Sequence, residues 1–97
     1  MKRHVRYTGT KAQREAAAFS DACAWLRDNA APGGLDMLCA HVRKCYAQQG
    51  PRVAYRSTLF YLGLAGVEGL PAYAFIRAQI RDAAAIRAAS NIAPFTR

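Results

Sequence analysis

Two residues of types used in nucleophilic catalysis, His41 and Cys45, stand four positions apart in the segment HVRKC. In a helix this spacing places both on one face, so the imidazole could take the proton of the thiol. Cys39 would be a third metal ligand, but on a helical wheel it points about 160° away from His41, and a fourth ligand is missing. We therefore expect no metal and no other cofactor, and we interpret these residues as ordinary core or surface positions.

The carboxylates do not form a candidate acid–base pair. General acid–base catalysis needs ionisable groups that share a pocket, whereas the six acidic residues are scattered singly along the chain, and several stand beside an arginine. The segment GLAGVEGLP, residues 63–71, spaces its glycines by three and lacks the lysine and hydroxyl residue of a phosphate-binding loop. The sequence thus predicts that the protein is not an enzyme.

Positive charge is the most informative chemical feature of the chain. Fourteen lysines and arginines against six acidic residues give a net charge of +8 over 97 residues. Such an excess favours polyanionic partners, namely nucleic acid, an anionic membrane or an acidic protein surface. The 21 alanines are typical of GC-rich coding, so the preference for arginine over lysine says little by itself.

Neither a membrane segment nor a signal peptide is evident. The longest apolar run lies between Arg56 and Glu68 and falls short of the about 18 residues that span a bilayer. The first fifteen residues contain no apolar stretch of the kind a signal peptide needs. We expect a cytoplasmic protein without a membrane partner, in which Cys23, Cys39 and Cys45 are reduced, buried thiols.

Turn signals divide the chain into four segments with helical periodicity. The predicted helices cover residues 11–29 with Thr10 as N-cap, then 35–48, 51–63 and 71–90. We predict one all-α domain, a small bundle of about four helices over residues 11–97, preceded by a basic and flexible arm at residues 1–10.

Apolar stripes indicate which side of each helix faces the core. Trp25 falls off its stripe, so it either covers the edge of the core or contacts a partner. The predicted core positions are Ala12, Ala16, Phe19, Cys23 and Leu26 in the first helix, Leu35, Leu38, Val42 and Cys45 in the second, and Ala72, Phe75, Ile76, Ile80, Ala83 and Ile86 in the last.

The segment GPRVAYRSTLFYLG, residues 50–63, is ambiguous. As a strand it would alternate apolar residues, but its only potential partner is the short stretch at residues 3–8, and unpaired backbone groups in a core are costly. As a helix it has apolar residues on two sides and leaves only a narrow stripe at Arg52 and Arg56. We favour a mainly buried helix with these two arginines at its exposed edge.

The second and third segments, joined by the turn QQGP, have the layout of a helix-turn-helix unit. In such a unit Arg52 and Arg56 would enter the major groove of DNA, and the basic arm would follow the minor groove. The same layout also occurs in any small helical bundle, and a recognition helix normally carries more polar residues than positions 59–62 do.

We therefore predict a small regulatory protein that contacts nucleic acid. The binding candidates are Lys2, Arg3, Arg6, Arg43, Lys44, Arg52, Arg56, Arg77 and Arg81, with Trp25 as a further partner contact. A less favoured form of this prediction is that a single-stranded nucleic acid stacks its bases on Tyr7, Trp25, Tyr55 or Tyr61.

An alternative is a protein-binding inhibitor or adaptor from a phage or plasmid, as anti-CRISPR proteins are, which blocks a host complex that handles nucleic acid. Only the small size and the lack of catalytic groups favour it. The alanine-rich side of the last helix is also compatible with a homodimer.

Overall fold

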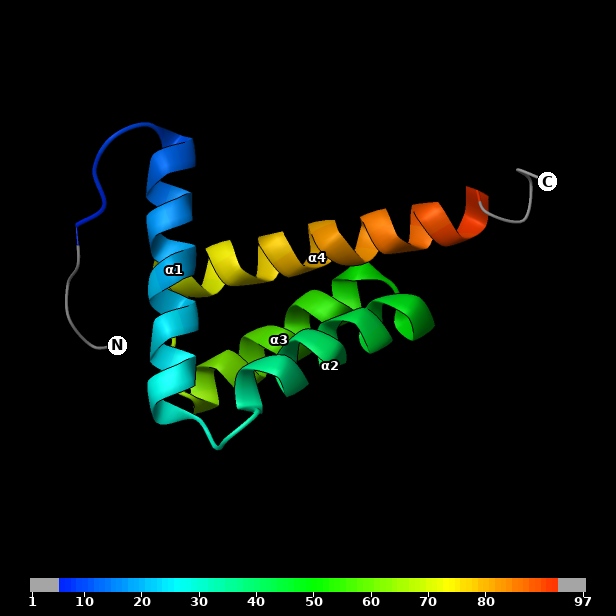
Figure 1. Ribbon diagram of the computed structural model, residues 1–97, viewed down its shortest axis with the longest axis horizontal. Helices are drawn as coiled ribbons and strands as arrows, with labels where there is room; N and C mark the ends of the chain where they lie inside the picture. Colours follow the sequence, from blue (N-terminus) through cyan, green and yellow to red (C-terminus); the bar gives the residue numbers. More distant parts are fainter. Residues whose placement is uncertain (1–5, 93–97) are drawn as a thin grey trace.

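A computed structural model describes residues 6–92, with side chains for residues 6–89. The described chain contains four helices and no strand: α1 (Lys11–Asn29), α2 (Gly34–Gln49), α3 (Pro51–Leu64) and α4 (Gly69–Ile92) (Figure 1). The prediction of a small all-α bundle is confirmed, and the ambiguous third segment is a helix. Its boundaries and those of the other helices differ from the predicted ones by at most two residues.

The helices form a hairpin, a long helix above it and a crossing helix at one end. α2 and α3 lie side by side and run in opposite directions, and α4 packs along both of them (Figure 1). α1 crosses the beginning of α4 and the end of the hairpin that is opposite the turn at Gly50. The outer end of α4 extends past that turn.

The start of α1 is set by a capping box, as its sequence predicts. The Gln13 backbone N–H donates to Thr10 Oγ1 at 3.2 Å, and the Thr10 N–H donates to Gln13 Oε1 at 2.8 Å. Leu26 is buried as predicted, whereas Ala12 and Ala16 are exposed. The first turns of α1 lie beyond the edge of α4, so none of the described helices covers that part of the predicted stripe (Figure 1).

The core lies where α1, α3 and α4 meet. Phe75, Ile76 and Leu62 are fully buried, and the Phe75 ring stacks on Phe19 with 6.1 Å between centroids. Trp25 covers the edge of this cluster, and its indole Nε1 donates to the Ala65 carbonyl at 2.8 Å. Because the large Trp25 ring packs on the core and its N–H is paired, these contacts stabilise the position of the turn between α3 and α4.

α3 is not mainly buried, contrary to expectation. Its buried stripe is narrow and consists of Ala54, Thr58 and Leu62, whereas Phe60 is 61% exposed and Leu64 is 70% exposed. The reason is that, among the described helices, α3 packs against α2 and α4, and none of them covers its outward face (Figure 1).

The last residue of the predicted core stripe of α4 is also exposed. Ala83 is buried, but Ile86, one turn later, is 49% exposed. Ile86 instead borders an open groove between α4 and α2, so its side chain is only partly covered.

Gly50 makes the tight connection between α2 and α3 possible. Its φ of 89° and ψ of 176° are accessible to glycine and strained for other residues, and Pro51 then begins α3 with a suitable φ. No atom lies within 4 Å of a Cβ built at Gly50, so only the backbone conformation requires glycine there.

Replacing Thr58 by valine is expected to stabilise the protein. Thr58 is fully buried and its hydroxyl has no hydrogen-bond partner, so the change removes an unpaired polar group while keeping the shape of the side chain. We expect the free energy of unfolding, measured by urea denaturation, to rise by about 1 kcal/mol.

Thr10→Val is the matched control, because it removes a capping hydroxyl and should lower the same free energy by about 1 kcal/mol. A loss of stability in Thr58→Val would show that this hydroxyl is paired in solution.

Candidate functional site

Positive charge is distributed unevenly over the helices. α1 carries three basic and three acidic residues, so its charge is balanced. Residues 34–64, which form α2 and α3, carry four basic residues and a single acidic residue, Asp36. α4 carries Arg77, Arg81 and Arg87 against Asp82. The excess positive charge of the described chain therefore belongs to α2, α3 and α4.

These cations are exposed, and nearly all are free of ion pairs. Every arginine and lysine between residues 6 and 89 is exposed. Within that range a single salt bridge forms, between Arg77 Nη1 and Glu15 Oε1 at 2.9 Å. Arg14 uses its guanidinium to donate to the Gly9 carbonyl. The other cationic side chains remain available to an anionic partner.

The predicted binding residues do not converge on one point. Arg52 and Arg56 lie one turn apart on α3, and Lys44 is exposed on α2. Arg43 instead borders the space between α2 and α4. Arg77 pairs with α1, and Arg81, one turn further along α4, is exposed.

The short turn of the expected helix-turn-helix layout is present, but α2 and α3 pack as an antiparallel hairpin. His41 Nε2 and Ser57 Oγ are 2.8 Å apart, and the His41 ring meets the edge of the Tyr61 ring at 5.1 Å, so the helices touch along their length. In DNA-binding helix-turn-helix units the two helices instead cross at about 90–120°. Arg52 and Arg56 thus lie in the first two turns of α3, next to the turn of a packed hairpin.

The described part of the N-terminal arm is held against α1. The Tyr7 hydroxyl donates to Asp21 Oδ2 at 2.7 Å, while Arg6 is exposed. Burial and the Asp21 carboxylate raise the pKa of the Tyr7 hydroxyl to about 12, so it remains a donor at neutral pH. Lys2 and Arg3 lie outside the described residues.

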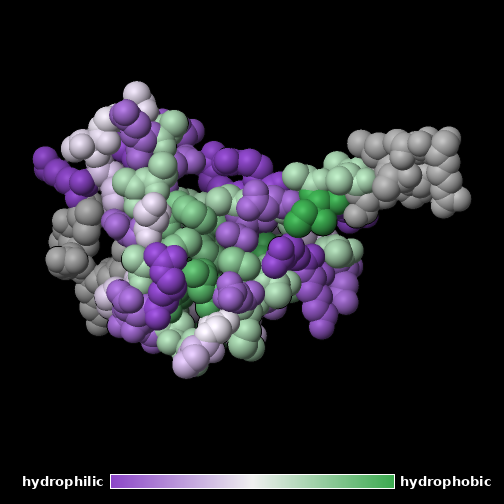
Figure 2. Space-filling model, in the orientation of Figure 1, coloured by the Kyte–Doolittle hydropathy of each residue, from purple (hydrophilic) through white to green (hydrophobic). Residues whose placement is uncertain are grey.

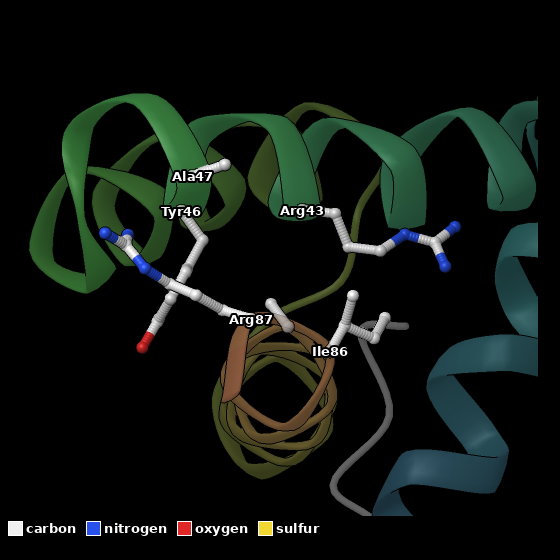
Figure 3. Close-up of a pocket in the computed structure, with 6 residues that line it drawn as sticks. Arg43, Tyr46, Ala47, Ile86 and Arg87 are labelled. Atoms are coloured by element: carbon white, nitrogen blue, oxygen red, sulfur yellow. The ribbon is translucent and has the colours of Figure 1, made fainter. Parts of the chain in front are cut away.

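A shallow groove of about 240 Å³ lies between α2 and the outer half of α4 (Figure 3). Arg43 and Arg87 border it, and their guanidinium groups point toward opposite ends. Tyr46 also lines it, together with three apolar side chains: Ala47, Ala83 and Ile86. No acidic residue lines the groove.

Sequence reasoning missed Tyr46 and Arg87 as candidates and placed Ile86 in the core. The last predicted helix is longer than either hairpin helix, so its final turns must extend past the hairpin. This difference in length was the sequence signal that could have been used.

Comparisons with models of known protein families, with curated proteins and with solved structures find no match for this chain. Function must therefore be inferred from the side chains themselves.

His41, Cys45 and Ser57 form a small cluster between α2 and α3. His41 Nε2 lies 2.8 Å from Ser57 Oγ and 3.4 Å from Cys45 Sγ, so the helical spacing does bring imidazole and thiol together. In the described chain no carboxylate accepts a hydrogen bond from this imidazole, and a group that orients the base is a usual part of a catalytic triad. The cluster is explained by the contact that it makes between the two helices.

The three cysteines are free and half-buried, which is less burial than expected. Burial raises the pKa of the Cys23 thiol and also that of the Cys39 thiol. The described residues contain no group of three or more side chains placed to hold a metal ion. Among these residues, too, no helix combines the length and apolar content needed to cross a bilayer.

Proposed function

We propose that this protein is a small, non-enzymatic binding protein whose partner is nucleic acid. The observation that supports this is the exposed positive charge of α2, α3 and α4 beside a charge-balanced α1, since among the described residues only Arg77 of these cations forms a salt bridge. Arginine and lysine side chains in such an arrangement bind phosphates and release counterions, which accounts for most sequence-independent affinity.

The proposed contact is mainly with the sugar–phosphate backbone of the nucleic acid. Specific reading of bases in the major groove needs a helix that protrudes into it, and the hairpin packing of α2 and α3 does not favour that. Arg52 and Arg56 are the leading phosphate ligands on α3, and Lys44 and Arg43 are those on α2.

Fluorescence anisotropy with a labelled short duplex and a labelled single strand tests this proposal. We expect binding at about 50 mM salt, with a loss of affinity of at least about 60-fold at about 200 mM, because about three to four phosphate contacts suffice for such a dependence. The absence of binding to both probes at the lower salt concentration would reject nucleic acid as the partner.

A second candidate function, binding to another protein, is supported by the outer hairpin face. We define this face as Met37, Val53, Phe60, Tyr61 and Leu64, all of them exposed. Met37 lies one turn before His41, and Leu64 one turn after Tyr61, so the antiparallel hairpin brings them to the same end. An exposed apolar area bordered by Lys44 and Arg56 has the composition of a protein interface.

One variant distinguishes the two functions. Met37→Ser combined with Leu64→Ser changes no charge, so its affinity for DNA should equal that of the wild type. If protein binding is the main activity, the wild type should instead retain a stoichiometric partner after nuclease treatment, and this variant should lose it.

A further inference from the structure

We propose that the groove between α2 and α4 holds one base of a single-stranded nucleic acid, with the base against Tyr46 and its flanking phosphates near Arg43 and Arg87. This inference rests on the proposed function, and it names the kind of strand and the residues that receive a base.

The lining of the groove matches a flat apolar ring with negative charge on both sides. It is lined by Tyr46 and by the apolar side chains of Ala83 and Ile86. Its two cations point to opposite ends, and Tyr46 lies on the side of Arg87 (Figure 3). Bases stack readily on aromatic side chains whatever their identity, while guanidinium groups pair with phosphates.

The size and place of the groove indicate a single base from an extended strand. At about 240 Å³ it lies below the usual range of about 300–1,000 Å³ for sites that enclose a complete small molecule. It opens onto the projecting end of α4, where Figure 2 shows apolar surface beside hydrophilic side chains, so a strand can pass along it. A base paired inside a duplex would not present its face to Tyr46.

The other aromatic residues expected to stack bases are engaged within the protein. The Tyr7 hydroxyl bonds to Asp21, and the Trp25 indole lies on the core and bonds to Ala65. Tyr55 is half-buried against Tyr73, and Tyr61 is in contact with His41. Tyr46, by contrast, makes no side-chain hydrogen bond or ring contact within the described residues and lines an open groove.

Affinity for a short oligothymidine and for an abasic strand with the same number of phosphates tests the inference. We expect the wild type to bind the oligothymidine about 5- to 100-fold more tightly, as is typical for stacking of one base. Tyr46→Leu keeps an apolar side chain and removes the aromatic face, so this preference should disappear while binding to the abasic strand stays unchanged. Tyr46→Phe should keep the preference.

Tyr73→Leu is the matched control, since Tyr73 is exposed on α4 and does not line the groove. It should keep the preference for bases, and circular dichroism should give the same helix content for all variants. Equal binding of both strands by the wild type would overturn the base site and leave the proposed function standing. Binding of neither strand would overturn the base site, and the duplex probe would then decide whether the proposed function stands. A preference that survives in Tyr46→Leu would also overturn the site.

Discussion

Phe75→Ala is expected to lower the free energy of unfolding by about 3–5 kcal/mol, the largest effect of any single substitution considered. Phe75 is fully buried, stacks on Phe19 of α1 and belongs to the cluster that also includes Leu62 of α3. Truncation removes contacts to two other helices at once and leaves a cavity that these helices cannot fill without moving. A domain of this size has a stability of only about 5–15 kcal/mol, so this loss is a large fraction of the total.

Urea denaturation followed by circular dichroism measures this effect. Leu64→Ala is the control, because it removes a side chain of similar apolarity from a position that is 70% exposed, and it should change the free energy of unfolding by less than about 0.5 kcal/mol. Similar losses in both variants would mean that α3 is covered in solution, for instance by a second copy of the chain.

Removing three cations from the hairpin is expected to have the largest effect on binding. In the variant Lys44→Gln, Arg52→Gln, Arg56→Gln, three exposed side chains without ion pairs lose their charge. If each contacts one phosphate, affinity for DNA should fall about 100- to 1,000-fold at low salt. Fluorescence anisotropy measures the change, and circular dichroism checks the fold.

A triple variant on α1 tests whether binding depends on a local interface or only on the net charge of the protein. Lys11→Gln, Arg14→Gln and Arg27→Gln remove the same charge from a helix that also carries three carboxylates. Such a variant loses only long-range electrostatic attraction to DNA, which salt screens beyond about 10 Å. Its affinity for DNA should therefore fall less than about tenfold. Equal losses in the two triple variants would refute an interface on the hairpin.

Local sequence signals were sufficient for the helices and their ends. Thr10 and Gln13 mark the start of α1 by a hydrogen-bonding pattern that involves only neighbours, and Gly50 with Pro51 separates α2 from α3 through backbone conformation. These effects depend on residues close in the chain, so they can be read without the fold.

Packing between the helices determines which side of each helix is buried. Hydrophobic periodicity does not specify this packing. Phe60 and Leu64 belong to an apolar stripe of α3, yet the buried stripe is that of Ala54, Thr58 and Leu62. A helix with apolar residues on two sides does not indicate which side its neighbours will cover.

The groove could not be predicted for a related reason. Arg43 and Arg87 are 44 positions apart, and they come together only because α4 passes over the end of the hairpin. Trp25, in contrast, was expected either at the edge of the core or at a partner, and its bond to Ala65 places it at the edge of the core.

The dependence of DNA affinity on salt concentration tests the central claim most directly. For the wild type, the logarithm of the association constant should fall against the logarithm of the salt concentration with a slope of about −3 or steeper, since each neutralised phosphate contributes about 0.9. In the hairpin triple variant the slope should be shallower by about 2 to 3. A slope near zero for the wild type, or the same slope for both proteins, would contradict a nucleic-acid interface built from the cations of α2 and α3.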